Sequence, residues 1–337
     1  MIDLRSDTVT QPTPDMLKAM CAAPLGDDVL GDDPSVHALE EMIADIMGTE
    51  TALFVPSGTM SNQIAIWLQT AKGTAIAIEQ NAHIYHYEAS APALLSGVRM
   101  KPILGDRGVM NSKELQKAFP PDDPHFSPIT MVCLEDTANK GGGTVYPMDT
   151  IKKIHSIARA HNTAFHLDGA RLFNAVVASG ISAKERTKFF DTISICFSKG
   201  LGAPVGSALC MPKSMKRDAI RIRKMLGGGM RQSGLLAAAA QYAVKYNIQK
   251  IEQDHHNTRI FALGLSETEI HVQAPQTNMV YFSHPNAHAF AERLKERGLW
   301  VLALNSDTIR AVFHLGITER EAHEAVHIVK DSLKDQP

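Results

Sequence analysis

Apolar positions along the first two thirds of the chain form short continuous runs that alternate with longer stretches of helical spacing. The short runs, which are typical of strands buried on both faces, lie at 51–55, 74–79, 98–103, 129–135, 163–167 and 192–197. Helical stretches occupy about 86–95, 111–118, 148–161 and 213–226. Because strands that alternate with helices favour a parallel sheet covered on both faces, the pattern predicts an α/β fold with a large, mostly parallel sheet.

A further helix near the start of the chain carries clear boundary signals. Asp33 precedes it, Pro34 suits its first turn, and Gly48 is suited to end it. Its apolar residues recur at helical spacing, at Val36, Leu39, Ile43 and Ile46. We therefore expect one face of this helix to pack on the core, just ahead of the strand at 51–55.

The pattern changes after residue 230. An alanine-rich stretch that begins at Leu235, and the segment 251–265, predict longer helices that leave the sheet. Strands are expected near 278–283, 299–303 and 308–313, and helices at 286–297 and 318–333. The expected division is an N-terminal segment (1–14), a large domain (15–245) and a small C-terminal α+β domain (246–337).

The 337-residue chain has the composition of a globular protein, with 44% hydrophobic and 21% charged residues. Lys and Arg total 34 against 36 Asp and Glu, so the chain lacks the basic excess that nucleic-acid binding requires. The N-terminus has no apolar signal segment, and no apolar run approaches the roughly 18 residues of a membrane span. We therefore expect a cytoplasmic protein with no nucleic-acid and no membrane partner.

The cysteines show no CxxC spacing, and they are Cys21, Cys133, Cys196 and Cys210. Cys133 and Cys196 lie inside apolar strand-like runs. The pattern therefore favours buried free thiols in a reducing compartment over disulfides.

Polar side chains follow four of the predicted strands, where ligands of open parallel sheets bind. These strand ends carry Ser57-Gly58-Thr59, Glu135-Asp136, Asp168-Gly169-Ala170-Arg171 and Ser198-Lys199-Gly200. The first of these groups opens a helix, and a helix N-terminus with small and hydroxyl residues suits a phosphate group. Ser and Thr are also common as plain helix caps, so this group alone leaves both interpretations open.

Asp168 and Lys199 each allow a structural and a catalytic interpretation. A buried carboxylate is rarely unpaired, so Asp168 is expected to pair either with Arg171 or with a cationic ring nitrogen of a cofactor. Lys199 ends an apolar strand, where desolvation would lower the pKa of its amine, as a Schiff-base lysine requires. A structural salt bridge is the alternative for Lys199.

A competing motif lies near the C-terminus. His323, Glu324 and His327 match the zinc-protease pattern HExxH, with the two histidines one helical turn apart. A third ligand normally follows well downstream, yet the sequence ends at Pro337. We therefore expect solvated histidines and no metal site, and keep a zinc hydrolase only as a remote alternative. The pair His255-His256 is likewise interpreted as surface residues.

Six longer segments of the sequence carry a family resemblance. They are Asp3–Thr10, Gly26–Pro34, Pro56–Asn62, His166–Phe173, Phe197–Gly206 and Arg223–Gln232. Together with a phosphate-type helix start, Asp168 and a Lys199 that follows 31 residues later (199 − 168), they resemble the low-specificity L-threonine aldolases. These are fold-type-I pyridoxal 5′-phosphate (PLP) enzymes, and the resemblance covers nearly the whole chain.

The resemblance implies a set of cofactor contacts. Lys199 would hold PLP as an internal aldimine, and Asp168 would pair with the pyridinium nitrogen. His83 would stack on the cofactor ring, and Arg171 would lie beside the cofactor. The phosphate would be bound by Ser57, Gly58 and Thr59, and by Arg231 from a neighbouring subunit. Such composite sites imply a homo-oligomer, expected here as a dimer of dimers, that is, a homotetramer.

The same resemblance implies the substrate contacts. Ser6, Arg171 and Arg310 would hold the substrate carboxylate, for which the planar guanidinium fork is well suited. Glu88 would lie close to His83. His125 resembles a second active-site histidine that acts near the substrate hydroxyl. The N-terminal segment 1–14 would therefore contribute to the active site.

The implied reaction is aldol cleavage of L-threonine and L-allo-threonine to glycine and acetaldehyde. The base that takes the β-hydroxyl proton stays open between His83, His125 and a water molecule that they hold. A phenylserine aldolase or a β-eliminating lyase on the same fold would share every cofactor residue. A non-catalytic PLP-binding protein is disfavoured because Lys199 and Asp168 are both present.

Overall fold

The computed structural model describes residues 1–334 of the chain and contains one large and one small main sheet. The large sheet has seven strands in the order β2-β10-β9-β8-β7-β3-β4. Their bounds are β2 (Thr51–Val55), β3 (Ala75–Glu79), β4 (Arg99–Ile103), β7 (Ile129–Glu135), β8 (Ala164–Gly169), β9 (Thr192–Cys196) and β10 (Ser207–Met211). Only β10 runs antiparallel to its neighbours, so the predicted α/β fold with a mostly parallel sheet is confirmed.

Strand β10 is the element of this sheet that the sequence pattern does not predict. It follows β9 through a turn that contains Gly202 and Gly206, both with positive φ, and no helix separates the two strands. The chain therefore folds straight back, and β10 pairs with β9 on one side and with β2 on the other.

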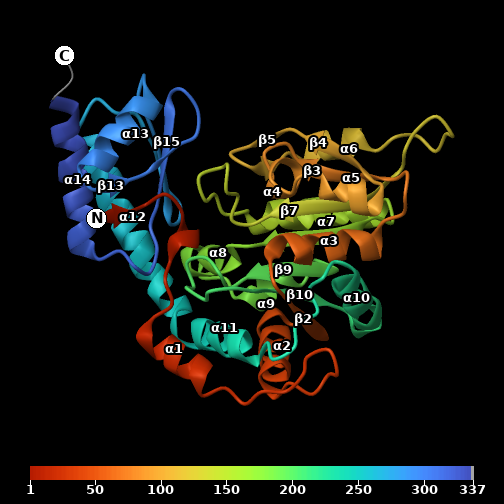
Figure 1. Cartoon of the computed structure of the whole chain (residues 1–337). Helices are drawn as coiled ribbons and strands as arrows, with labels where there is room; N and C mark the ends of the chain where they lie inside the picture. Colours follow the sequence, from red (N-terminus) through yellow and green to blue (C-terminus); the bar gives the residue numbers. More distant parts are fainter. Residues whose placement is uncertain (335–337) are drawn as a thin grey trace.

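Helices cover both faces of the large sheet, as the alternation predicted (Figure 1). One face carries α2 (Pro34–Met47), α7 (Met148–Ala160), α8 (Leu172–Ser179), α9 (Ala183–Thr187) and α11 (Gly234–Tyr246). The other carries α3 (Gly58–Gln69) and α10 (Lys213–Met225). Strand residues divide between the two cores in alternation, since Phe54 packs with the first group and Leu53 with the second. Asp33 caps α2, and Gly48 ends it in a left-handed conformation, as expected.

The C-terminal part, blue in Figure 1, forms a second, antiparallel sheet backed by helices. The sheet contains β11 (Val272–Gln273), β12 (Met279–Ser283), β15 (Thr308–Val312) and β14 (Leu302–Ala303). The helices are α12 (Ile251–Ser266), α13 (Ala287–Glu296) and α14 (Glu319–Lys334). The single strand expected at 299–303 is divided between β14 and β13 (Leu299–Trp300), which belong to different sheets.

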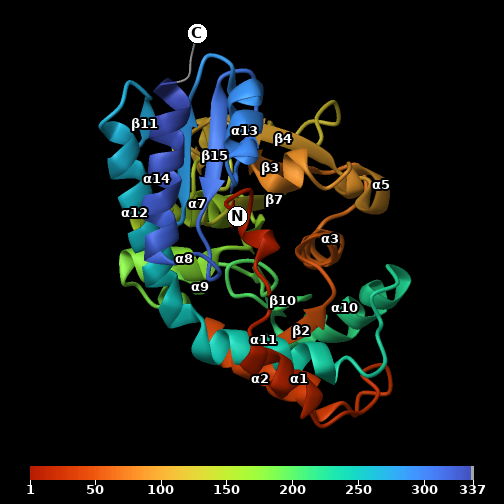
Figure 2. The same cartoon turned by 60° about the vertical axis from the view of Figure 1, so that its left-hand side comes forward.

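The N-terminal residues join the two parts of the molecule. Strand β1 (Ile2–Asp3) pairs in parallel with β13, and Leu4 is buried in the C-terminal core. After the 3-10 helix η1 (Asp7–Val9), the chain continues to α1 (Pro14–Cys21), which packs on α11 of the large part (Figure 2). Residues near position 7 therefore lie between the two parts. The domain boundaries at 14/15 and 245/246 stay predictions.

Shorter elements fill the connections of the large part. They are α4 (His83–His86), α5 (Ala91–Ser96), β5 (Gly105–Asp106), β6 (Val109–Met110), α6 (Ser112–Ala118) and the 3-10 helix η2 (Ile248–Lys250). The single helix expected at 86–95 is wrong. Ala89 and Ser90 adopt left-handed backbone conformations, with φ of 50° and 59°, and this interrupts the helix between α4 and α5.

Two expectations about burial need correction. Cys21 is exposed, whereas Cys133, Cys196 and Cys210 are buried free thiols as expected. His255 is buried rather than on the surface, and its Nε2 lies 3.0 Å from Asn174 Oδ1. Among the described residues, no helix combines the length and the apolar character that crossing a membrane demands.

Candidate active site

The start of α3 follows β2 directly and has the features of an anion site. Ser57 caps the helix, since its Oγ accepts a hydrogen bond from Met60 N at 3.2 Å. The amides of Gly58 and Thr59 lie in the first turn, where a helix provides them with no acceptor. Ser207 Oγ is buried without a partner, 3.6 Å from the position that a Cβ on Gly58 would take. Backbone and hydroxyl donors without protein acceptors therefore gather at this helix start, as a phosphate site requires.

Asp168, at the carboxyl end of β8, is buried and receives neutral donors. Its Oδ2 accepts from Asn62 Nδ2 at 2.9 Å and its Oδ1 from the amide of Ala170 at 3.1 Å. Arg171, offered by the sequence as its structural partner, is paired with Asp7 instead. The first of the two alternatives for Asp168, an ion pair with Arg171, is therefore wrong. Arg171 does not compensate the charge of the Asp168 carboxylate.

His83 and Glu88 lie next to Asp168. Ligand atoms of these three side chains lie within 4.8 Å of one another. Glu88 Oε1 accepts from Asn62 Nδ2 at 2.8 Å and lies 3.2 Å from His83 Nδ1, and its Oε2 accepts from Gln63 Nε2 at 2.6 Å. The amide group of Asn62 thus donates to both carboxylates, and holds them side by side.

The electrostatics of the cluster favour a charged imidazole. Burial alone would lower the pKa of His83, but the hydrogen bond with Glu88 and the charges of Asp168, Glu88 and Glu135 outweigh burial, so the pKa is raised. Because Glu88 accepts at Nδ1, the Nε2 atom of His83 is the nitrogen left for another group.

His166 supports this cluster from behind. Its Nε2 lies 3.1 Å from Asn62 Oδ1, and its Nδ1 lies 2.8 Å from Thr192 Oγ1. Burial lowers the pKa of His166 to about 4, so the ring is neutral near pH 7. Since Asn62 must direct its NH₂ group at two carboxylates, its oxygen accepts from His166 Nε2–H, and the hydrogen-bond directions are fixed.

Two arginines lie between the N-terminal segment and the sheet edge. Arg171 Nε and Nη2 each donate to the Asp7 carboxylate at 2.6 Å. Arg310 Nη1 donates to Asn139 Oδ1 at 3.1 Å, and its Nη2 donates to the carbonyl of Arg5 at 3.0 Å. Burial lowers the pKa of Arg310; for Arg171 burial acts in the same direction, but the Asp7 charge outweighs it and the pKa is raised.

Ser6 and Lys199 complete the set near these arginines. Ser6 caps η1, and its Oγ accepts from Thr8 N at 3.2 Å. Lys199 follows β9, and its charge contributes to lowering the pKa of Asp7, so the two groups lie near each other. The side chain is only half-buried, and full desolvation of Lys199 at the strand end is therefore not what the structure shows.

His125 and Arg231 lie apart from these residues within one chain. His125 belongs to the loop between α6 and β7, which projects from the edge of the molecule in Figure 1, and its Nδ1 lies 2.7 Å from Asp123 Oδ1. Arg231 is exposed and pairs with Asp27 at 2.9 Å. Within residues 1–334, neither forms a hydrogen bond or ion pair with another predicted site residue, and both roles stay predictions.

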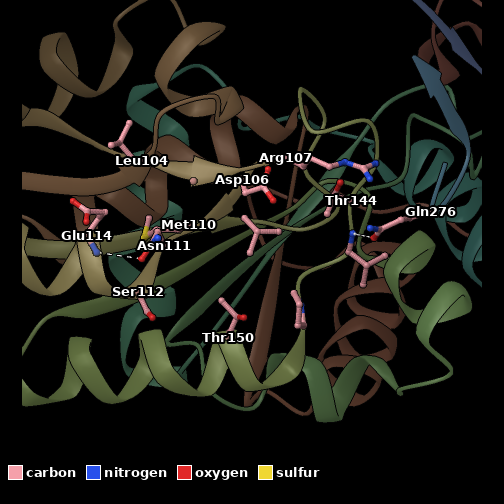
Figure 3. Close-up of a pocket in the computed structure, with 14 residues that line it drawn as sticks. Leu104, Asp106, Arg107, Met110, Asn111, Ser112, Glu114, Thr144, Thr150 and Gln276 are labelled. Carbon is pink, nitrogen blue, oxygen red and sulfur yellow. Dashed lines mark hydrogen bonds between the residues drawn. The ribbon is translucent and has the colours of Figure 1, made fainter. Parts of the chain in front are cut away.

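A surface cavity of about 760 Å³ is lined by none of the predicted site residues (Figure 3). It is lined in part by Arg107, Asn111 and Gln276. These polar groups are already used for structure: Asn111 caps α6, Gln276 Oε1 accepts from Val145 N, and Arg107 donates to a backbone carbonyl. The cavity offers no cluster of titratable groups comparable with that at His83.

The HExxH residues form a surface feature. His323 and His327 are exposed on α14 and line a shallow cavity together with Arg297 and Arg320. Among residues 1–334, the one group of three suitable ligands is His83, Glu88 and Asp168, so the zinc-hydrolase alternative has no support from the structure.

Several residues of the site were not predicted from sequence. Asp7 and Asn62 lie inside the segments that carry the family resemblance, but the resemblance implies no role for them here. Glu135 is predicted from sequence only as an acid at a strand end. Their partners are far away in the sequence, as with Asn62 and Asp168, which are 106 residues apart. No local pattern signals such contacts.

The large open sheet, with an acid, a lysine and a helix N-terminus at the carboxyl ends of its strands, defines the class of fold-type-I PLP-dependent enzymes. Solved structures agree on the fold. A threonine aldolase of Leishmania major superposes with a TM-score of 0.85 at 19% identity, over 98% of this chain and 99% of that one. A structure of SPT with a PLP internal aldimine gives 0.77 at 16% identity, over 98% and 87%.

Sequence comparison gives the family. The model of the family described as beta-eliminating lyase matches residues 3–285. The low specificity L-threonine aldolase of Escherichia coli (strain K12) is 43% identical over 97% of this chain and 98% of its own length. The low-specificity L-threonine aldolase 1 of Arabidopsis thaliana is 40% identical over 98% and 96%. The chain belongs to the beta-eliminating lyase family and, within it, to the low-specificity L-threonine aldolases.

Proposed function

We propose that this chain is a PLP-dependent aldolase that cleaves L-threonine and L-allo-threonine to glycine and acetaldehyde. The observation that carries the proposal is the position of Asp168, a buried carboxylate beside His83 and at the same sheet edge as Lys199. The names of the relatives support the same reaction. The buried free thiols support a reducing, cytoplasmic setting.

The residues present fit PLP as the cofactor. The free amides at Gly58 and Thr59, with the unpartnered Ser207 hydroxyl, suit its phosphate. Asp168 suits a protonated ring nitrogen, and Lys199 suits the aldehyde carbon. When bound, PLP supplies an electron sink for the pair released when the Cα–Cβ bond of the substrate breaks.

The chain's own residues then have defined tasks. Arg171 and Arg310, with Ser6, bind the substrate carboxylate and fix the orientation of the bond to be broken. Asp7 already accepts one N–H of Nε and one of Nη2 of Arg171, so both N–H groups of Nη1 and the second of Nη2 remain for the substrate. The negative charge of the Asp168 carboxylate would stabilise the protonated form of the cofactor's ring nitrogen.

Proton transfer at the substrate hydroxyl requires a base. His83 is the histidine that the fold brings to the acid cluster, and its Nε2 is free to take a proton when the ring is neutral. The alternative base is His125 or a water molecule held by either ring. His125 is exposed, and its Nδ1 contacts Asp123 rather than the acid cluster.

The proposal includes an oligomer with shared sites, arranged as a dimer of dimers. Arg231 is exposed and follows the glycine-rich turn 227–229, so it is accessible to a partner chain. Symmetric association would let each chain donate Arg231 to the phosphate of its neighbour.

The deciding experiment follows the products from each threonine stereoisomer. The PLP-loaded protein is expected to release glycine and acetaldehyde from the L-threo and L-allo forms but not from their D enantiomers. Phenylserine and serine are assayed in parallel to test the two lyase alternatives. Release of ammonia and a 2-oxo acid, with no glycine from any stereoisomer, would overturn the aldolase assignment in favour of a β-eliminating lyase.

A further inference from the structure

Glu135 joins two separate backbone segments through the two oxygens of its carboxylate. Oε2 accepts a hydrogen bond from the amide of His83 at 2.6 Å, and Oε1 accepts from the amide of Asn139 at 2.8 Å. Glu135 ends β7 and is 6% exposed. His83 is the first residue of α4, whose amide has no acceptor within the helix, so Glu135 supplies it.

Each segment that Glu135 holds carries part of the candidate site. His83 belongs to the acid cluster with Glu88 and Asp168. The other segment places Asn139, whose Oδ1 accepts from Arg310 Nη1 at 3.1 Å. The carbonyl of Asn139 also accepts from the hydroxyl of Tyr281 at 2.9 Å. One carboxylate therefore links the imidazole of the site to the loop that aligns Arg310.

We propose that Glu135 is a positioning residue: its ionised carboxylate holds the His83 segment and the Asn139–Arg310 segment in register, and protonation releases one of them. The consequence for catalysis rests on the proposed function, whereas the link between the two segments does not. Glu135 itself touches neither substrate nor cofactor in this proposal.

The requirement for the ionised form follows from the hydrogen-bond inventory. Both partners of Glu135 are N–H donors, and only a carboxylate offers two oxygens that both accept freely. A protonated carboxyl has one hydroxyl oxygen, whose own proton would face a donor. One of the two contacts would then be lost, at the cost of leaving a partly buried amide without an acceptor.

Several charged or titratable groups lie near Glu135. Asp168 is its register partner on β8, His83 lies at the start of α4, and Arg171 lies at the start of α8. Glu88 follows α4. The Glu135 charge also contributes to raising the pKa of Tyr146, which precedes α7.

The balance of these groups places the titration of Glu135 near neutral pH. Burial and the negative charge of Asp168 raise its pKa to about 7, against the two amide contacts and the charge of His83, which act to lower it. The carboxylate form, and with it both contacts, therefore prevails above about pH 7 and declines below it.

Hydrogen–deuterium exchange of the purified protein without PLP tests the link directly. In the wild type, protection at residues 83 or 139 is expected to fall between about pH 8 and about pH 6, after correction for the intrinsic exchange rate. In Glu135→Gln, protection at these positions is expected to be lower and independent of pH. The control is Glu267→Gln, which removes an exposed carboxylate paired with Lys330 and should leave both segments unchanged.

Kinetics give a second readout. Misplacement of Arg310 should raise KM and lower kcat/KM by about 10- to 100-fold in Glu135→Gln, and the acid limb near pH 7 should disappear from its pH profile. Glu135→Asp, which keeps the charge, should retain an acid limb.

The two readouts separate failure of this inference from failure of the aldolase assignment. A wild-type protein that cleaves no threonine overturns the assignment, while the exchange profile still decides the role of Glu135. Exchange that is independent of pH in the wild type, or equal in wild type and Glu135→Gln, overturns the inference. If Glu135→Gln does not fold, the wild-type profile alone decides.

Discussion

Arg171 and Asp7 are joined by two hydrogen bonds of 2.6 Å, although they lie 164 residues apart in the sequence. Both side chains are almost entirely buried. A planar guanidinium paired in this way is fixed in orientation as well as in charge. The pair therefore orients the arginine that the proposed reaction uses for the substrate carboxylate, and it ties the N-terminal segment to the sheet edge.

Asp7→Asn should weaken both substrate binding and stability. The substitution leaves the buried charge of Arg171 without its partner, a loss of about 3–5 kcal/mol in comparable buried pairs. We expect a lower free energy of unfolding, measured by chemical denaturation, and a raised KM for threonine. Asp15→Asn, which makes the same chemical change at an exposed aspartate paired with Lys18, is the matched control and should alter both quantities little. A stable variant with wild-type KM would show that Asp7 does not orient Arg171.

The same pair predicts a pH dependence of stability at low pH. Burial acts to raise the pKa of Asp7, but the Arg171 pair and the charges of Lys199 and Arg310 outweigh it, and the pKa falls from 3.8 to about 2. A lowered native pKa stabilises the fold above the unfolded pKa and loses that contribution as pH falls through about 2. The contribution is about 2 kcal/mol.

The measurement compares wild type and Asp7→Asn by denaturant unfolding from about pH 5 to about pH 2. The difference in free energy between them should shrink as pH falls, because protonation removes the charge that the variant already lacks. A constant difference over this range would contradict a lowered pKa for Asp7.

Lys199→Ala should abolish cofactor attachment and turnover while it leaves the fold intact. The side chain is half-buried, and within residues 1–334 it forms no salt bridge whose loss would destabilise the chain. The absorbance band of lysine-bound PLP and the threonine cleavage rate should both be lost, with an unchanged circular dichroism spectrum. Cleavage at the wild-type rate would refute the role of Lys199 as the attachment site.

Asp168→Asn should slow cleavage with little change in the cofactor's phosphate contacts. Removing one charge from a buried pair costs about 3–5 kcal/mol. If this cost falls on the activation barrier, the rate decreases by about a hundredfold to a few thousandfold. The measurement is kcat at saturating PLP, with bound PLP determined separately. Unchanged kcat at normal occupancy would leave Asp168 as a mere acceptor for Asn62 and Ala170.

The sequence predicts elements and strand-end residues well because both depend on local patterns. Asp168 and Lys199 each follow an apolar strand, and Ser57 precedes a helix, so their positions at the sheet edge follow from the fold class alone. Contacts between distant segments carry no such signal. The Asp7–Arg171 pair and the link through Glu135 depend on how separate segments meet in space.

Backbone conformation limits sequence prediction in another way. The helix expected at 86–95 fails at Ala89 and Ser90, which adopt left-handed conformations although neither is glycine. Pro92 lies within the expected range and in the first turn of α5, so the sequence itself contains a local signal that a new helix starts there. The role predicted for Arg231 requires a second chain, which no property of one chain supplies.

The proposal that Arg231 crosses a subunit boundary can be tested with two inactive variants. Arg231 is 59% exposed and bonds only with Asp27 among the described residues, so its substitution should leave the single chain folded. Arg231→Ala homomers should bind PLP weakly, because a charge-assisted contact to the phosphate is lost. Lys199→Ala homomers should retain PLP without covalent attachment or catalysis. Each variant alone is therefore expected to be inactive.

Mixed oligomers of these two variants should regain activity if the site is shared. In a closed symmetric interface each chain donates to its partner's site, so a mixed dimer contains one site with both lesions and one with neither. Random assortment places half of the chains in such mixed dimers, and about a quarter of the wild-type activity should return after co-refolding. If Lys199 and Arg231 instead served the same site within one chain, every site would carry a lesion. A mixture that stays inactive, with mixed oligomers demonstrated by native mass spectrometry, would therefore refute the shared site while leaving the aldolase assignment untouched.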